Sequence, residues 1–156
     1  MRKIVSTLFL IAAFFGSHSK IVAQDNKNVI QNLKEGLAIQ GYDPVTYFSQ
    51  NKAVEGKKTI SQLYNGATYY FSSEANKATF TKDPAKYEPA YGGYCAYAMA
   101  FGDQVKIDPE TFKVKEGRLF LFYNFRFNNT LTDWKKDEVN LFKKAEAEWK
   151  KLNGGK

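Results

Sequence analysis

The segment YGGYCAYAMA, residues 91–100, holds the only cysteine of the chain, Cys95, and Met99 follows it four residues later. On a helix, side chains four positions apart lie on the same face, about 5–6 Å apart at their Cβ atoms. A thiolate and a thioether on one face are soft ligands that suit Cu(I). If this segment is helical, Cys95 and Met99 therefore form a candidate Cu(I) site, to which a partner would add a third ligand.

Thiol chemistry is a second interpretation of Cys95. A helix that starts after the glycine pair Gly92–Gly93 would hold the thiol in its first turn, where the helix dipole stabilises a thiolate. Such a thiol suits a redox or sensor role through a mixed disulfide or a protein partner. A third interpretation is a small core residue, because free cysteine is among the most buried residue types.

The N-terminus has the pattern of a secretory signal peptide. Arg2 and Lys3 precede an apolar run over residues 4–15, and a cleavage site fits before Gln24. The apolar run is shorter than the ~20 residues that a membrane-spanning helix needs. We therefore predict a signal peptide over residues 1–23, a periplasmic or secreted protein, and no stable membrane span after cleavage.

Cleavage would remove the only histidine, His18, and three of the 23 basic residues but none of the 16 acidic ones, which leaves a formal charge of +4. Without a histidine a Cys–His hydrolase is excluded, and without a second cysteine a CxxC oxidoreductase is excluded. The lysines are scattered among acidic residues rather than clustered, so no nucleic-acid partner is expected. The residue types that remain after cleavage therefore favour a non-enzymatic protein.

Tyrosines surround the cysteine in sequence and occur again near residue 42. Tyr42, Tyr91, Tyr94 and Tyr97 are candidates to line a pocket, and the alternative is that these rings belong to the core.

Two hairpins are predicted from their turns. Asn65–Gly66 lies between the strand-like runs 59–64 and 67–72, which is typical of a type I′ turn. Glu116–Gly117 similarly separates residues 112–115 from 118–123.

Helices are predicted from their caps and apolar spacing. Asp43–Pro44 reads as an N-cap followed by proline at the first helical position. Ser72 or Ser73 caps a helix that carries Phe80, a short helical turn carries Tyr87, and a further helix covers residues 94–101.

The last helix is strongly amphipathic and starts at Thr130 or Thr132. Its apolar stripe consists of Trp134, Leu141, Phe142, Ala145, Trp149 and Leu152. This stripe predicts a helix that packs across the domain. Hairpins and helices without a regular βαβ alternation indicate the α+β class, with a polar N-terminal segment over residues 24–36 and one domain over residues 37–152.

The stretch YNGATYYFSSEANKATFTKDPAKYEPAYGG resembles the core of the YHS domain, and GYDPVTYF resembles the opening D-P-V-C element of that family. The order of GYDPVxYF and YGGYCAxAMA resembles that of exported bacterial YHS-domain-containing proteins. The resemblance implies a small unit of hairpins and helices, related to treble-clef zinc fingers and associated with transition metals.

The ligand positions of the family fall on Thr46, Ser72 and Asn76 in this chain. None of these is a soft metal ligand, so a structural zinc site is not expected. The sequence thus predicts an exported, non-enzymatic YHS-type binding module, linked to copper through Cys95. The alternatives are a thiol-based redox or sensor protein and an interaction domain without a ligand, and the metal or protein partner is not identified.

Overall fold

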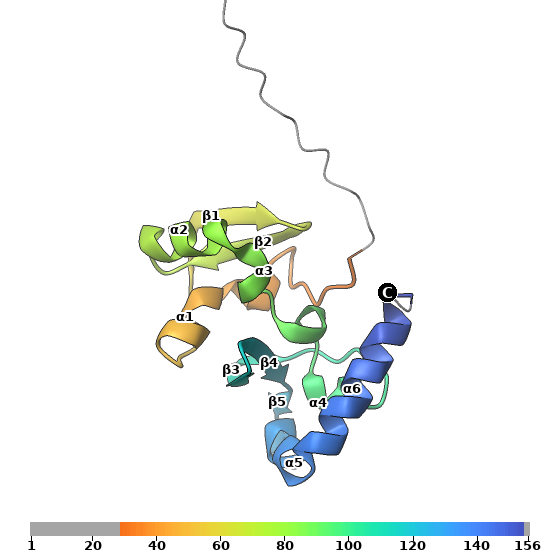
Figure 1. Ribbon diagram of the computed structural model, residues 1–156. Coiled ribbons are helices and arrows are strands. Elements are labelled where there is room, and N and C mark those ends of the chain that lie inside the picture. Colours follow the sequence, from red (N-terminus) through yellow and green to blue (C-terminus); the bar gives the residue numbers. More distant parts are fainter. Residues whose placement is uncertain (1–28, 155–156) are drawn as a thin grey trace, which may run out of the picture.

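The computed structural model describes residues 29–154 (Figure 1). The predicted signal peptide, residues 1–23, and the first part of the predicted polar segment, residues 24–28, lie outside the described residues. Over the described part of the chain, no helix is both long enough and apolar enough to cross a membrane. Helices and small antiparallel hairpins are mixed along the chain, which confirms the α+β class.

The first half of the described chain is a hairpin with short helices beside it (Figure 1). Its elements are η1 (Ala38–Gly41), α1 (Pro44–Ser49), β1 (Lys57–Tyr64), β2 (Ala67–Phe71), α2 (Glu74–Lys82) and α3 (Pro84–Tyr87). Asn65 and Gly66 both have positive φ angles, 47° and 80°, as a type I′ turn requires. The first predicted hairpin is thus confirmed, with strand ends that differ by one or two residues.

The second half contains the other two hairpins and the C-terminal helices. Its elements are η2 (Ala90–Gly93), α4 (Ala96–Met99), β3 (Asp108–Lys115), β4 (Arg118–Phe122), β5 (Asn124–Phe125), β6 (Asn128–Asn129), α5 (Thr130–Lys136) and α6 (Glu138–Leu152). Glu116 and Gly117 form the predicted turn between β3 and β4.

The helix predicted over residues 94–101 is much shorter, because α4 has only four residues. Cys95 is its N-cap and has a non-helical backbone, with φ of −57° and ψ of 118°. Its N–H donates to the carbonyl of Val105 at 3.0 Å, and Cys95 forms a parallel bridge with Leu121. Pairing with neighbouring chain segments therefore holds Cys95 outside the helix.

The C-terminal helix is interrupted, whereas the sequence predicts one helix. Asp137 has φ of −146° and ψ of 46°, which lies outside the helical region and separates α5 from α6. The N-cap of α5 is Asn129, not Thr130 or Thr132, since the Asn129 side chain accepts from the Leu131 N–H at 3.0 Å. The predicted packing is confirmed, because Trp134, Leu141 and Ala145 are buried.

Two groups of buried side chains form the core. The first core cluster consists of Ala38, Ile39, Val45, Tyr47, Ala67, Tyr69, Phe71, Phe80, Tyr87, Cys95, Ile107, Leu119 and Leu121. The second core cluster consists of Ala90, Tyr91, Ala96, Met99, Ala100, Phe120, Phe122, Trp134, Leu141 and Ala145. Strand β4 contributes to both, because alternate side chains of a strand point to opposite faces.

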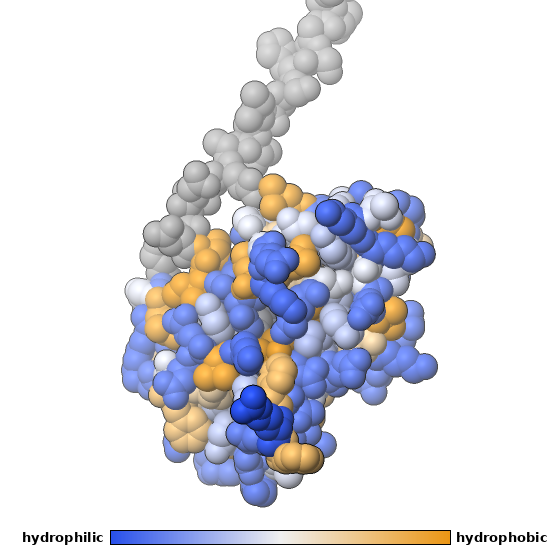
Figure 2. All heavy atoms as spheres, turned by 180° about the vertical axis from the view of Figure 1, so that it is seen from behind, coloured by the Kyte–Doolittle hydropathy of each residue, from blue (hydrophilic) through white to orange (hydrophobic). Residues whose placement is uncertain are grey.

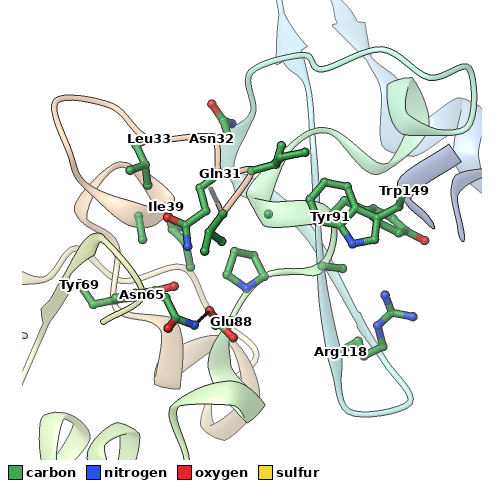
Figure 3. Close-up of a pocket in the computed structure, with 16 residues that line it drawn as sticks. Gln31, Asn32, Leu33, Ile39, Asn65, Tyr69, Glu88, Tyr91, Arg118 and Trp149 are labelled. Atoms are coloured by element: carbon green, nitrogen blue, oxygen red, sulfur yellow. Dashed lines mark hydrogen bonds between the residues drawn. The ribbon is translucent and has the colours of Figure 1, made fainter. Parts of the chain in front are cut away.

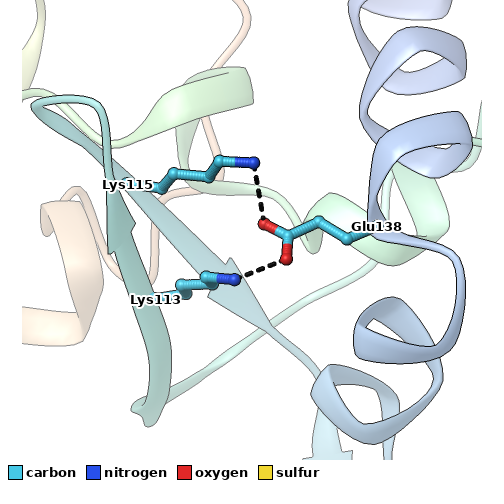
Figure 4. Close-up of polar contacts among 3 residues, drawn as sticks. All are labelled: Lys113, Lys115 and Glu138. Atoms are coloured by element: carbon cyan, nitrogen blue, oxygen red, sulfur yellow. Dashed lines mark hydrogen bonds and ion pairs between the residues drawn. The ribbon is translucent and has the colours of Figure 1, made fainter.

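Charged side chains link α6 to the second hairpin. Glu138, in the first turn of α6, pairs with Lys113 and Lys115 of β3 (Figure 4). The Lys115 Nζ to Glu138 Oε1 distance is 3.3 Å. These two lysines hold the pKa of the Glu138 carboxyl below its ordinary value, the hydrogen bond from Lys113 being the largest cause.

Candidate functional site

The carboxylate of Asp43 is fully buried and accepts hydrogen bonds from three segments of the chain. Its Oδ1 accepts from the Val45 N–H at 2.9 Å, so the predicted N-cap of α1 is confirmed. Its Oδ2 accepts from the N–H and the hydroxyl of Ser72 at 2.7 and 2.6 Å, and from the Asn76 amide at 2.7 Å. Four donors thus converge on this carboxylate, one on Oδ1 and three on Oδ2.

Asp43 brings together the positions that the YHS resemblance assigns to metal ligands. Ser72 follows β2, Asn76 lies in the first turn of α2, and Thr46 lies in α1, where its hydroxyl donates to the Asp43 carbonyl at 2.9 Å. The Asn76 amide also donates to the Ser72 hydroxyl at 3.2 Å. The Asp43 cluster, defined as Asp43, Thr46, Ser72 and Asn76, therefore joins three elements.

The donor set of the Asp43 cluster does not fit a structural zinc ion. Such a site uses four Cys, His or carboxylate ligands, and this cluster offers one carboxylate whose oxygens already accept four hydrogen bonds. Across residues 29–154, no group of three or more His, Cys, Asp or Glu side chains is arranged to hold a metal ion. At these positions, the side chains of Thr46, Ser72 and Asn76 make hydrogen bonds to Asp43.

Cys95 lies in the interior, with no exposed surface. The Tyr123 N–H donates to its sulfur at 3.4 Å, and the Thr130 hydroxyl lies 3.4 Å from the sulfur. Because the single hydroxyl hydrogen of Thr130 is used toward the Tyr123 carbonyl at 3.0 Å, the thiol is the donor to Thr130. Cys95, Tyr123 and Thr130 thus form a closed ring of hydrogen bonds.

Met99 is also fully buried but belongs to the second core cluster, whereas Cys95 belongs to the first. Their spacing is one helical turn, and the Met99 N–H donates to the Cys95 carbonyl at 2.9 Å. The prediction places Cys95 and Met99 on one face of a helix. In the structure, Cys95 is the non-helical N-cap of α4, and the two side chains pack in different core clusters.

The four candidate tyrosines have different neighbours. The Tyr42 hydroxyl lies 3.4 Å from a Glu110 carboxylate oxygen, and Tyr97 contacts Phe101. The Tyr94 hydroxyl donates to the Gln31 carbonyl at 3.2 Å. Among these four rings, Tyr91 alone lines the cavity described next.

A cavity of about 310 Å³ lies between the two halves of the described chain (Figure 3). Its lining includes Ala38, Ile39, Asn65, Tyr69, Glu88, Pro89, Ala90, Tyr91, Gly92, Arg118 and Trp149. Residues 29–33 complete it, and they belong to the segment that the sequence places outside the domain. Of the apolar residues in this segment, Ile30 is half-buried, whereas Val29 and Leu33 are exposed, so the sequence offers only a weak signal of a packed strap.

The strap, residues 29–33, is held by the glycine turn of η2. The Asn32 N–H donates to the Gly92 carbonyl and its side-chain amide to the Gly93 carbonyl, both at 2.9 Å. Gly92 has φ of +60°, and a Cβ there would lie 2.1 Å from the Ile30 carbonyl oxygen. Only glycine therefore permits this close approach of the two backbones.

Two charged side chains, Glu88 and Arg118, line the cavity (Figure 3). Glu88 is half-buried and accepts from the Asn65 amide at 3.1 Å; burial raises the pKa of its carboxyl, and the Asn65 bond opposes that shift. Arg118 donates to Glu146 at 2.9 Å, and the Tyr91 hydroxyl donates to the same Glu146 oxygen at 2.8 Å. Burial, and then the neighbouring Glu146, raise the pKa of Tyr91.

The outer surface seen in Figure 2 shows apolar residues in separate groups among polar ones. Several large apolar side chains are exposed in the described residues, among them Leu63, Phe101, Phe127 and Val139. Scattered exposure of this kind is ordinary for a folded protein. The cavity therefore remains the stronger candidate for ligand binding.

The fold and the Asp43 cluster define a small α+β domain in which a hairpin and two helices meet at one buried point. Residues 45–91 match the family model of the YHS domain, so the chain contains a YHS domain. The matched segment runs from α1 into η2 and ends at a residue that lines the cavity. No curated protein and no solved structure matches the chain significantly.

Proposed function

We propose that this protein is an exported, non-enzymatic binding module that captures a small molecule in the cavity at the edge of its YHS domain. The observation that carries this proposal is the cavity itself, which brings rings, an amide, a carboxylate and a guanidinium together. Its volume of about 310 Å³ falls at the lower end of the range for small-molecule sites, roughly 300–1,000 Å³.

The side chains around the cavity support binding rather than catalysis. Residues 29–154 contain no histidine, and Cys95 does not line the cavity. The lining residues therefore include no Cys–His or Ser–His pair, the usual arrangement of a nucleophile beside its base.

Export is the part of the proposal that rests on the N-terminal sequence. N-terminal sequencing of the protein from a native host, after separation of cytoplasmic and exported fractions, tests it. We expect a mature chain that begins at Gln24, and retention of the intact chain in the cytoplasm would contradict export.

The binding role is tested by NMR with 15N-labelled mature protein and a panel of small cationic, neutral and anionic aromatic compounds. We expect at least one compound to shift the indole signal of Trp149 and the amides of the strap and η2. The Trp134 indole is the internal control, because that residue is buried in the second core cluster. Failure of every compound to shift the cavity signals would overturn this role.

We further propose that the Asp43 cluster holds no zinc ion, and the test of this point has a matched positive control. The triple variant Thr46→Cys, Ser72→Cys, Asn76→Cys supplies soft ligands at the positions gathered around Asp43. In competition with a chelator, we expect the triple variant to retain Zn(II) and the natural protein to retain none. Stoichiometric Zn(II) on the natural protein would contradict the proposal.

The alternative roles of Cys95, in Cu(I) binding with Met99 or as a reactive thiol, stay predictions with their own test. The burial and hydrogen bonds of Cys95 favour a structural thiol that reacts slowly while the protein is folded. Cu(I) retention that disappears in Cys95→Ser and in Met99→Ala would support the copper role. Rapid alkylation of the native thiol would support the redox or sensor role.

A further inference from the structure

The guanidinium of Arg118 is already neutralised by its neighbours. It donates to Glu146 at 2.9 Å and lies 5.6 Å from the ring centre of Tyr91 and 5.2 Å from that of Phe120. An ion pair and three rings, the third being Phe142 at 5.8 Å, stabilise this positive charge within the protein. The positive charge of Arg118 therefore does not require a bound anion in the cavity.

The carboxyl group of Glu88 has no comparable partner in the described chain. Its carboxylate accepts a hydrogen bond from the neutral amide of Asn65, and none of the salt bridges within residues 29–154 includes Glu88. The group is half-buried, and its charge also contributes to the raised pKa of Tyr69. Burial without a cation makes the ionised carboxylate costly, and a bound cation would offset that cost.

Aromatic rings add a second feature that favours a cation. Tyr69, Tyr91 and Trp149 all line the cavity together with Glu88 (Figure 3). Tyr69 and Tyr91 are almost fully buried, so the half-buried Trp149 is the ring that offers a ligand the most surface. The faces of such rings attract organic cations, and their area also suits the apolar part of a ligand.

We propose that the cavity binds a small organic cation, whose ammonium or guanidinium group pairs with Glu88 while its apolar part contacts Trp149. This inference rests on the proposed binding function and specifies its ligand class. Asn65 holds the Glu88 carboxylate in place, and the strap forms another part of the cavity wall.

The test uses three probes of similar shape and different charge on the mature protein: benzylamine, benzyl alcohol and benzoate. Binding is followed by Trp149 fluorescence and by the Trp149 indole NMR signal, with Trp149→Phe to assign the fluorescence change. We expect benzylamine to bind at least about tenfold more tightly than the other two, because an ion pair in a partly buried site favours the cation.

Glu88→Gln is the decisive variant, since it removes the charge and keeps the shape and the hydrogen bond with Asn65. We expect it to abolish the preference for benzylamine, whereas Glu110→Gln, an exposed carboxylate outside the cavity, should leave the preference unchanged. Circular dichroism spectra of both variants show whether they fold.

The outcomes separate this inference from the proposed function. Cavity shifts with benzyl alcohol or benzoate that equal or exceed those with benzylamine would overturn the cation inference and leave the binding function standing. A benzylamine preference that survives in folded Glu88→Gln would also overturn it. No shift of the Trp149 signal with any probe would overturn both.

Discussion

The carboxylate of Asp43 is shielded from solvent and accepts four hydrogen bonds. Because no water can replace a lost donor, each of these bonds is needed to stabilise the buried group. The sequence predicts only one of these bonds, the N-cap to Val45, because it is local. Ser72 and Asn76 lie 29 and 33 residues further along the chain, so their approach depends on how β2 and α2 pack. Local patterns contain no information on that packing.

Asp43→Asn should destabilise the protein strongly. The change replaces an acceptor by an amide that faces the donors of Ser72 and Asn76, and hydrogen bonds to charged groups are each worth about 1.5–3 kcal/mol. We expect a loss of at least about 3 kcal/mol in the free energy of unfolding, measured by urea titration.

Asp83→Asn is the matched control for that measurement. Asp83 also precedes a proline and also starts a helix, but its side chain makes no cap hydrogen bond. We expect it to cost less than about 0.5 kcal/mol. Equal losses in the two variants would mean that the Asp43 carboxylate does not organise the cluster.

Glu138 gives a pH-dependent prediction at the same scale. Lys113 and Lys115 lower the pKa of its carboxyl, so the stabilisation is present above the pKa of the unfolded chain and is lost as pH falls through the folded-state pKa. Glu138→Gln should cost about 0.3–1 kcal/mol at pH 7, because the pair is partly exposed. The difference between the two proteins should shrink as the solution is acidified below about pH 4, near the ordinary range for a glutamate.

Thermal denaturation of both proteins across this pH range, at low and high salt, measures the contribution of Glu138. Added salt should reduce the difference at pH 7, since screening weakens partly exposed pairs. A difference that persists unchanged in acid would show that the loss comes from packing rather than from charge.

At the scale of elements, the sequence predicts both main hairpins because their turns need positive φ angles, which Asn–Gly and Glu–Gly pairs provide. It fails where contacts with other elements decide the backbone. Cys95 stays non-helical because it pairs with Leu121, and the strap is fixed through backbone atoms of Ile30, Asn32 and Gly92. Side-chain patterns do not reveal backbone-to-backbone contacts, so Tyr91 is the only candidate pocket tyrosine that lies in the cavity, and the strap is not predicted to form part of its wall.

Gly92→Ala should release the strap from η2. The new Cβ would lie 2.1 Å from the Ile30 carbonyl oxygen, a clash that requires the two segments to separate. We expect faster amide hydrogen exchange at Asn32 and loss of probe binding in the cavity. Gly117→Ala is the control, because that glycine has φ of +73° and no atom within 4 Å of an added Cβ.

Both variants carry the cost of alanine at positive φ, roughly 1–2 kcal/mol. Only Gly92→Ala should add the loss of strap contacts, seen as exchange confined to residues 30–34. Equal exchange behaviour in the two variants would mean that the strap does not depend on Gly92.

At the scale of the whole molecule, strand β4 lies between the two core clusters and contributes side chains to both. Leu119 and Leu121 belong to the first cluster, and Phe120 and Phe122 belong to the second. The continuous apolar run of β4 is typical of a strand buried on both faces, so the sequence does contain this signal. The segment that matches the YHS family lacks β4 and Ile107, and its core is therefore incomplete without the second half.

Unfolding should accordingly be a single transition for the whole domain. Trp134 and Trp149 report on the second cluster and its edge, and near-ultraviolet circular dichroism also detects the tyrosines of the first, including Tyr47, Tyr69 and Tyr87. We expect the urea transitions from the two methods to coincide, as in two-state folding. Leu121→Ala, which removes a fully buried side chain beside Cys95, should shift both transitions together and cost about 2–5 kcal/mol. Separate transitions, or a shift confined to the tyrosine signal, would mean that the YHS half folds without the C-terminal helices.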